Sequence, residues 1–370
     1  MTQIVHIGNI DFEFECASKS LKPLDTSGYS NVLCLQLQFL PILYARPCDV
    51  VAVTDYPSQE YLDFLEQTGW FPEGLPRLAL LREYTSFQGK QCAFWGPSQR
   101  VQKWALQRDM DCVMPSWDLV RQVNSKAFSF LYRIFPEAAL LANESELSTW
   151  LQKTIGEKVL KTCFGVSGQG NLCLSNSYSF PDILNFCRKE WQAKRFVIGE
   201  PWVERVCDFS TQWLIHPNRY IEPIGATRFE TSEQGQYQGT MAGPEELLFA
   251  DMIPFLQEHR REALKALNDM AAMGCFGYVG VDALVYRDRE THSFKLYPVV
   301  EINGRRTLSL VALQMQQRIS PEHILQMQLH QGKNPEQSLL PSQLMNSKQK
   351  QVVFHRYLTI TRHSYTGCLV

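Results

Sequence analysis

The chain has little that would fix its fold covalently or hold it in a membrane. Its 11 cysteines are odd in number and scattered, with no CxxC pair, so the sequence predicts reduced thiols and neither a disulfide framework nor a zinc ribbon. No stretch approaches the ~18 consecutive apolar residues of a membrane helix. The opening segment MTQIVHIGNIDFEFE lacks a positive region followed by an apolar one, so we expect no signal peptide and a cytoplasmic location.

An excess of charge of one sign is also missing. The 36 Lys and Arg residues nearly cancel the 38 Asp and Glu residues, which gives a net charge of -2. This balance excludes the basic footprint of a general nucleic-acid binder and the polybasic runs that attach to anionic lipids, so we expect neither nucleic acid nor a membrane as partner. What is present is a chain of 370 residues, 45% of them hydrophobic, which is enough for two or three domains with sizeable cores.

The first third of the chain alternates between strand-like and helix-like segments. Leu33–Leu37 and Val50–Asp55 are compact apolar runs that we expect to be strands. Ser58 can cap a helix that follows the second run and ends at Gly69. A further strand and helix follow in the same order, so the sequence predicts a small α/β domain with a parallel sheet that ends near Pro115.

The middle of the chain has the pattern of mixed α+β units. A helix that begins at Ser116 leads to Lys126, and a longer one from about residue 255 ends at Gly274. Two alternating runs after it, Tyr278–Tyr286 and Phe294–Asn303, predict a hairpin. The other strands and helices that we expect here lie at 158–162, 171–175, 181–191, 196–199 and 209–243.

A glycine-rich turn separates two of these short strands. Its residues are Gly165-Val-Ser167-Gly168-Gln-Gly170, and small residues in succession let backbone N–H groups converge on an anion such as a phosphate. No Gly-Lys-Ser/Thr follows, which excludes a Walker A loop, and a strand follows where a Rossmann fingerprint needs a helix. Taken alone, the turn fits an ordinary hairpin connection at least as well.

Two lysines precede the turn. Lys161 lies in the strand four residues before Gly165, where an unpaired lysine is costly to bury, and it can reach a phosphate that the turn covers. Lys126, 35 residues earlier, is a second candidate at the end of an apolar helix face. Each lysine by itself is also explained as a solvated surface residue.

The hairpin carries an acidic and amide cluster. Glu301 and Asn303 are two residues apart on a strand, so both side chains project from one face. If the turn is centred between Thr291 and His292, Asp282 lies directly opposite Glu301, ~5 Å away. Carboxylate and amide oxygens suit Mg²⁺ that is shared with substrate phosphates. The alternative is that one carboxylate forms a salt bridge with a nearby arginine, namely Arg287, Arg305 or Arg306.

The order of these pieces resembles the ATP-grasp superfamily. Lys126, Lys161 with the glycine turn, EPWV at 200–203, Asp282 in GVDALV and VEINGR at 300–305 follow one another as in that superfamily. The pattern is most similar to its carboxylate–amine ligases with a preceding small α/β domain, the pre-ATP-grasp domain. We assign no catalytic role to any of the eight histidines.

The resemblance implies a division of the chain. A pre-ATP-grasp α/β domain would span 1–115, and a two-subdomain ATP-grasp fold, α/β and α+β in class, would span 116–310 with its lid subdomain at about 143–198. The segment 311–370, whose pattern is weaker, would pack on the core.

The resemblance also implies roles for individual residues. ATP phosphates would be held by Lys126 and Lys161 under a lid formed by Gly165, Ser167, Gly168 and Gly170. The adenine edge would meet Glu200 and the backbone of Trp202 and Val203, and the ribose would meet Asp208 or, as a second choice, Glu204. The ligands of Mg²⁺, or alternatively Mn²⁺, would be Asp282, Glu301 and Asn303.

Two arginines complete the implied catalytic set. Arg305 follows the metal ligands at a position that often faces a phosphate or a substrate carboxylate. Gly280 stands where some relatives carry an arginine, and Arg228 is the residue that we expect to supply that charge. The hairpin loop between Asp282 and Glu301 is longer and more charged than in compact members.

The implied activity is an ATP-dependent carboxylate–amine ligase. A substrate carboxylate would attack the γ-phosphate of Mg-ATP, and an amine would then displace phosphate from the acyl phosphate. The partners would be a small-molecule carboxylate and an amine, and a homodimer is left open. The alternatives are a kinase on the same scaffold and a catalytically inactive nucleotide-binding module.

Overall fold

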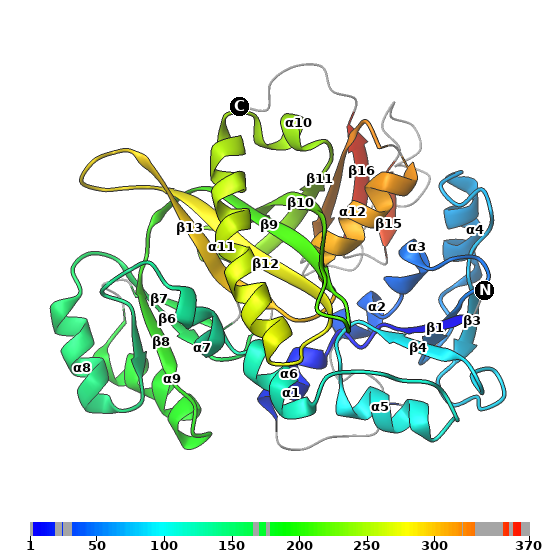
Figure 1. The fold of residues 1–370 in the computed structure, drawn as a ribbon, viewed down its shortest axis with the longest axis horizontal. Coiled ribbons are helices and arrows are strands. Elements are labelled where there is room, and N and C mark those ends of the chain that lie inside the picture. The colour runs from blue at the N-terminus through cyan, green and yellow to red at the C-terminus, as the bar shows by residue number, and fades with distance from the viewer. Residues whose placement is uncertain are drawn as a thin grey trace.

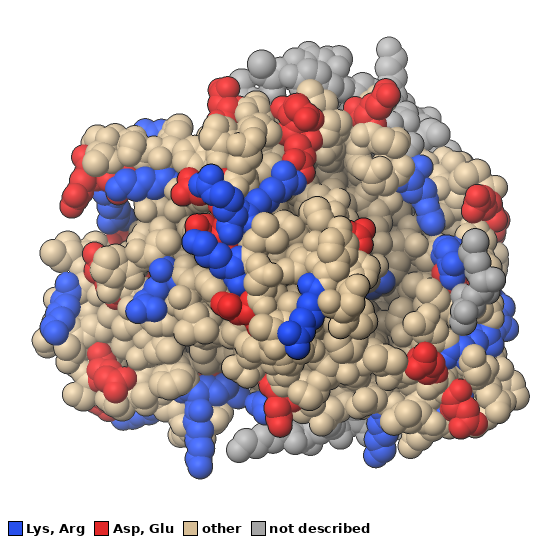
Figure 2. All heavy atoms as spheres, viewed as in Figure 1, with Lys and Arg blue, Asp and Glu red and all other residues tan. Residues whose placement is uncertain are grey.

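The computed structural model describes residues 3–18, 24, 32–165, 170–174, 178–319, 321–329, 351–354 and 358–363. The strands of this part form three sheets, of four, eight and four strands (Figure 1). No helix in the described ranges has the length and apolar character needed to cross a membrane. On the face seen in Figure 2, positive and negative side chains alternate over the surface, so no field of one sign dominates this face.

The N-terminal part contains a parallel sheet, as the sequence predicted, and the order of its strands is β3-β2-β1-β4. Ser58 caps α4 by accepting a hydrogen bond from the N–H of Tyr61, and Gly69 follows the helix at a φ of 67°. The elements are β1 Ile4–Ile7, α1 Phe12–Ala17, α2 Val32–Leu37, α3 Pro41–Tyr44, β2 Val50–Val53, α4 Gln59–Gln67, β3 Arg77–Leu80, β4 Gln91–Phe94 and α5 Gln99–Leu106.

One predicted strand is wrong. Leu33–Leu37 lies in helix α2. A short apolar run does not distinguish a buried strand from a buried helix turn by its periodicity. In the structure Cys34 and Leu37 are buried and Leu35 is less so, which is the three-residue spacing of one helix face.

The second sheet, β5-β8-β6-β7, is antiparallel and lies apart from the other two with α8 and α9 (lower left of Figure 1). Its core includes Trp150 of α8, which packs so closely on β8 that a Cβ added at Gly199 would lie 2.7 Å from the indole ring. The elements that follow α5 are α6 Trp117–Val123, α7 Lys126–Ser129, β5 Ala139–Leu141, α8 Glu144–Lys153, β6 Lys158–Thr162, β7 Asn171–Leu174, α9 Phe180–Gln192 and β8 Val197–Pro201.

The third sheet has eight strands in the order β13-β12-β9-β10-β11-β14-β16-β15. Helix α11 lies across β9 and β12 and buries Leu267 and Met270 against the sheet (Figure 1). The elements are β9 Glu204–Ile215, β10 Ile221–Thr231, β11 Tyr237–Ala242, α10 Glu245–Phe249, α11 Ile253–Ala272, β12 Gly277–Arg287, β13 Phe294–Asn303, α12 Leu308–Ile319, β14 Ile324–Leu329, β15 Gln351–Phe354 and β16 Leu358–His363.

The hairpin of β12 and β13 pairs Asp282 with Glu301, as predicted, although the assumed turn is wrong. Next to the turn, Arg287 pairs with Phe294. A turn centred between Thr291 and His292 would instead pair Arg287 with Leu296, two residues later. Leu284 pairs with Tyr297, and the register shifts between Leu284 and Asp282. A bulge in β13 therefore brings Glu301 opposite Asp282.

A buried histidine anchors this bulge. His259 of α11 is 0% exposed, and its Nδ1 lies 2.6 Å from the carbonyl oxygen of Pro298, within the bulge. Since a carbonyl only accepts, Nδ1 carries the proton, and Nε2 accepts from the hydroxyl of Thr211 at 2.6 Å. The indole N–H of Trp213 donates to that hydroxyl at 2.8 Å. Helix α11 thereby holds the segment that positions Glu301.

Burial lowers the pKa of His259 to about 4, which makes the stability of the protein depend on pH. The unfolded chain takes up this proton below about pH 6.5, whereas the folded protein resists it, so the free energy of unfolding should fall as the pH drops from 6.5 to 4. The share of His259 is roughly 3 kcal/mol. Urea unfolding at pH 7.5 and 4.5 should show a smaller loss for His259→Gln than for the wild type. His292→Gln, at an exposed histidine in the connection between β12 and β13, is the control and should leave the loss unchanged. An equal loss in His259→Gln would contradict the assignment.

Candidate functional site

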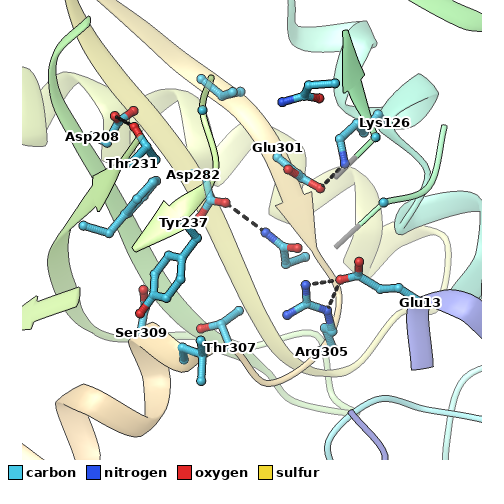
Figure 3. A pocket seen from close by; sticks show the side chains of 18 of the residues that line it. Glu13, Lys126, Asp208, Thr231, Tyr237, Asp282, Glu301, Arg305, Thr307 and Ser309 are labelled. Carbon is cyan, nitrogen blue, oxygen red and sulfur yellow. Dashed lines mark hydrogen bonds and ion pairs between the residues drawn. The ribbon is translucent and has the colours of Figure 1, made fainter. Parts of the chain in front are cut away.

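The described part of the chain encloses a large cavity. Its lining comes from the N-terminal part, from β6 and β7 with the ends of the turn between them, and from one face of the eight-stranded sheet. Figure 3 shows Asp282 and Glu301 on neighbouring strands, with Lys126 reaching Glu301 and Glu13 facing Arg305. The predicted site residues that line this cavity are Lys126, Lys161, Gly165, Gly170, Trp202, Asp208, Asp282, Glu301, Asn303 and Arg305.

Asp282, Glu301 and Asn303 come together at the centre of the cavity. The side-chain amide of Asn303 donates to Oδ2 of Asp282 at 3.1 Å. Burial, together with the neighbouring Glu301 carboxylate, raises the pKa of Asp282 to about 7. Two carboxylates this close favour either a shared proton or a cation between them.

The donor set fits a magnesium ion. It offers two carboxylates and one amide oxygen, and Mg²⁺ in proteins typically takes one or two carboxylates and completes its shell with water and substrate phosphates. In the ranges that the structure describes, no group of three or more His, Cys, Asp or Glu side chains forms a metal-binding cluster. A metal held here would therefore depend on oxygen atoms from a bound phosphate.

Buried polar side chains form a ladder of hydrogen bonds that ends at Asp282. Thr307 donates to Gln212 at 2.7 Å, Gln212 donates to Ser210 at 2.7 Å, and the Ser210 hydroxyl hydrogen-bonds Asp282. A Cβ added at Gly280 would lie 2.8 Å from the Thr307 methyl group. Since the ladder fills this space, an arginine does not fit at Gly280 without moving it.

Glu301 forms its ion pair with Lys126, which sequence reasoning did not weigh. Their Nζ and Oε1 atoms are 2.6 Å apart. Of the arginines considered as partners, Arg287 pairs with Glu204 and Arg305 pairs with Glu13. The third, Arg306, stacks between the rings of Tyr44 and Tyr278.

Lys161 is likewise paired. Its Nζ lies 2.6 Å from Oε2 of Glu200, whose other oxygen accepts from the hydroxyl of Tyr297 at 3.1 Å. Glu200 is 5% exposed and is absent from the lining of the cavity, so it supports Lys161 from behind. The lysine end faces the cavity beside the glycine turn.

The ends of the glycine turn face each other. A Cβ at Gly170 would lie 2.2 Å from Oγ1 of Thr162, and one at Gly165 would lie 3.2 Å from the Gly170 backbone. Larger residues would thus separate the strands that the turn joins. Ser167 and Gly168, predicted to belong to the same lid, lie outside the described residues.

The residues expected around adenine and ribose occupy different surroundings. Trp202 lines the cavity, and its backbone N–H donates to the carbonyl of Glu157 at 2.8 Å, so this donor is already engaged, and the expected backbone contact with adenine stays a prediction. Val203 packs in a separate apolar cluster. Asp208 lines the cavity and accepts from Arg205 and from Thr231 at 3.0 Å, whereas Glu204 is exposed.

Arg228 does not lie where we expected it. Arg228 lies on β10 and pairs with Phe209, which belongs to an apolar cluster and does not line the cavity. Its guanidinium donates to the carbonyl of Leu248 at 3.2 Å. Its neighbour Phe229 pairs with Asp208 and lines the cavity. Because side chains alternate along a strand, Arg228 points to the opposite face, and its predicted catalytic role is dropped.

Glu13 is a site residue that the sequence pattern missed. It lies in α1, 292 residues before Arg305, and its Oε1 accepts from Nε of that arginine at 2.6 Å. Arg305 also donates to the backbone carbonyl of Arg306 at 3.0 Å. Nothing in the local sequence distinguishes Glu13 from its neighbour Glu15, which binds Ser98 and Arg100 within the N-terminal domain.

No protein-family model matches the chain, and no curated protein matches its sequence. Solved structures match its fold. N5-carboxyaminoimidazole synthase from Aspergillus clavatus, in complex with ADP and 5-aminoimidazole ribonucleotide, has a TM-score of 0.54 and 12% identity over 98% of this chain and 94% of its own. N5-carboxyaminoimidazole synthetase from Staphylococcus aureus, complexed with ADP, has a TM-score of 0.52 and 11% identity over 98% and 92%.

Rhizobium etli pyruvate carboxylase gives a TM-score of 0.55 and 12% identity, over 98% of this chain and 36% of that one. At these identities the likeness concerns the fold alone. The chain has the ATP-grasp fold, and the fold that the order of its sequence motifs implied is thereby confirmed.

Removal of one of the two central carboxylates should stabilise the metal-free protein. A carboxyl whose pKa is raised in the folded state lowers the free energy of unfolding as the pH rises from about 4 to 7. Asp282→Asn should therefore have a higher melting temperature than the wild type at pH 8 with EDTA. At pH 4 the two melting temperatures should be similar. Asp288→Asn is a control of opposite sign on the same hairpin, because the Lys295 ammonium 2.6 Å away lowers the pKa of Asp288. A lower melting temperature for Asp282→Asn at pH 8 would contradict this account.

Proposed function

We propose that the chain is an ATP-dependent ligase that joins a small carboxylic acid to an amine through an acyl phosphate. One observation carries the proposal: two lysines and an Asp–Glu–Asn set from distant segments line a single cavity. Such a set can offset the charge of a triphosphate and of an attacking carboxylate. The likeness to proteins crystallised with ADP supports a nucleotide in this cavity.

The nucleotide would lie between the four-stranded sheet β5-β8-β6-β7 and the eight-stranded sheet. Lys161 and the turn bounded by Gly165 and Gly170 would contact the phosphates, and Trp202 would pack against the base. Asp208 accepts hydrogen bonds from Arg205 and Thr231. The remaining lone pairs of its carboxylate would accept hydrogen bonds from the ribose hydroxyls.

A divalent ion would be held by Asp282, Glu301 and Asn303, together with phosphate oxygens. When bound, Mg²⁺ supplies charge neutralisation at the transferring phosphoryl group. The Lys126–Glu301 pair is arranged for this exchange, since a Glu301 carboxylate engaged by a cation holds Lys126 less strongly. Lys126 could then turn its three donors to a phosphate.

The chemical step needs no covalent nucleophile from the protein. An oxygen of the substrate carboxylate attacks the γ-phosphorus, the bond to the β–γ bridging oxygen breaks, and ADP leaves. The amine then attacks the acyl carbon, phosphate leaves, and the amine loses a proton. Arg305, on the substrate side of the metal set, would neutralise the carboxylate. The glycine turn would keep water from the acyl phosphate.

The metal assignment is tested at Glu301. Glu301→Gln keeps the size of the side chain but removes the negative charge, so Mg-dependent ATP turnover should fall at least about a hundredfold. The measurement is phosphate release over a panel of carboxylic acids and amines. Glu204→Gln, at an exposed glutamate paired with Arg287, is the matched control and should keep wild-type turnover. Full activity in Glu301→Gln would refute the assignment, and a stable phosphorylated product in the wild type would favour the kinase.

Nucleotide binding is tested at Lys161. Lys161→Met removes a charge-assisted contact to a phosphate and should raise the Kd of ATP about ten- to a hundredfold. Lys158→Met is the control on the same strand, since Lys158 bonds the backbone at Gly156 and does not line the cavity. The double variant Lys161→Met, Glu200→Gln avoids a buried unpaired carboxylate and should bind ATP as weakly. Unchanged affinity in both variants would remove Lys161 from the site.

A further inference from the structure

One end of the cavity is left over once the nucleotide and metal groups are assigned. It is built from the N-terminal domain and from the start of α12, and its walls are mostly apolar. The apolar side chains that line it are Ile10, Cys34, Leu37, Leu40, Trp95 and Leu308. Leu37, Leu40 and Trp95 belong to one buried cluster against which Ile10 and Leu308 pack, so these walls are contiguous.

Among the described residues, one of the charged side chains that line the cavity, Arg205, pairs with Asp208. Two others have no role toward the nucleotide or the metal. They are Glu13 and Arg305, which pair with each other. Arg305 directs both its Nε and its Nη2 to the same oxygen of Glu13, Oε1. The loop that carries Arg305 is fixed beside the apolar wall, because the N–H of Arg306 donates to the carbonyl of Trp95 at 2.9 Å.

The second oxygen of Glu13, Oε2, is buried, and no donor among the described residues reaches it. Glu13 is 9% exposed and lines the cavity. A buried acceptor without a hydrogen bond destabilises the folded protein, and more so when it is charged. A ligand that brings a positively charged donor to Oε2 would satisfy this acceptor.

We propose that the acid activated in this cavity is an α-amino acid with an apolar side chain. Its ammonium group would donate to Oε2 of Glu13, and its carboxylate would take donors of Arg305. Both groups sit on one carbon atom, which matches the direct contact between Glu13 and Arg305. The side chain would lie along Ile10, Leu37 and Trp95. The proposal rests on the proposed ligase function and names its substrate class.

The same walls disfavour a phosphorylated sugar at this end. A phosphate needs several converging donors, and Arg305, the cation here, is already offset by Glu13. An aspartate or glutamate substrate would place a second carboxylate against Leu37 and Leu40, which offer it no hydrogen bond. The reaction that follows activation would transfer an aminoacyl group to the amine.

The test uses the wild-type protein with Mg-ATP and hydroxylamine as the amine, which converts any activated acid into a hydroxamate. Leucine and phenylalanine are compared with 4-methylpentanoate and 3-phenylpropanoate, which lack the amino group, and with aspartate. We expect kcat/KM for each amino acid to exceed that for its deaminated counterpart at least about tenfold, the scale of one charge-assisted hydrogen bond. Aspartate should react more slowly still.

Glu13→Gln provides the residue-specific readout. It should lower the ratio of kcat/KM for leucine to that for 4-methylpentanoate by about tenfold or more, because only leucine carries the ammonium group. A merely structural loss would lower both values together and leave the ratio unchanged. Glu66→Gln, at an exposed glutamate in the same domain, is the control and should keep the ratio.

The outcomes separate this proposal from the ligase proposal. Hydroxamate from the deaminated acids or from aspartate in preference to leucine would overturn the substrate class and keep the ligase. If no acid gives phosphate or hydroxamate, the ligase proposal fails, and ligand-induced melting shifts decide the subsite. A shift with leucine and none with 4-methylpentanoate would support the Glu13 subsite, and equal or absent shifts would overturn it.

Discussion

Two carboxylates on neighbouring strands, Asp282 and Glu301, impose the constraint on which the rest of the cavity depends. Side by side in a partly buried position, they need positive charge close by, and in the structure Lys126 provides it from 2.6 Å. Their meeting is not a simple result of hairpin geometry. The bulge in β13 sets it, and His259 holds the bulge from the other side of the sheet by binding the Pro298 carbonyl.

Charge balance is repeated around the cavity. Each of its cations faces a carboxylate, in the pairs Lys126–Glu301, Lys161–Glu200, Arg205–Asp208 and Arg305–Glu13. Pairs of this kind avoid the large penalty of an isolated buried charge. They also suit a site for Mg-ATP and a zwitterion, because a ligand that brings both signs of charge can replace the partner of each side chain without leaving a charge exposed to the apolar walls.

Sequence reasoning succeeded where chemistry and spacing coincide. The lysines before the turn, the Asp–Glu pairing and the helix cap at Ser58 depend on local signals, and the structure places them as expected within the cavity or the fold. It failed where the answer depended on which side of a sheet a residue faces. Arg228 is one position away from the cavity-facing Phe229, and a one-residue change of phase moves a side chain to the other face.

The sequence by itself determined the order of elements, the two lysines and the acidic hairpin, because strand alternation, helix caps and turn residues act over a few neighbouring positions. Only the tertiary structure decided which charges are partners. Glu13 and Arg305 are 292 residues apart, and Lys126 and Glu301 are 175 apart. No local pattern connects such residues, since their contact arises from the packing of distant segments around one cavity.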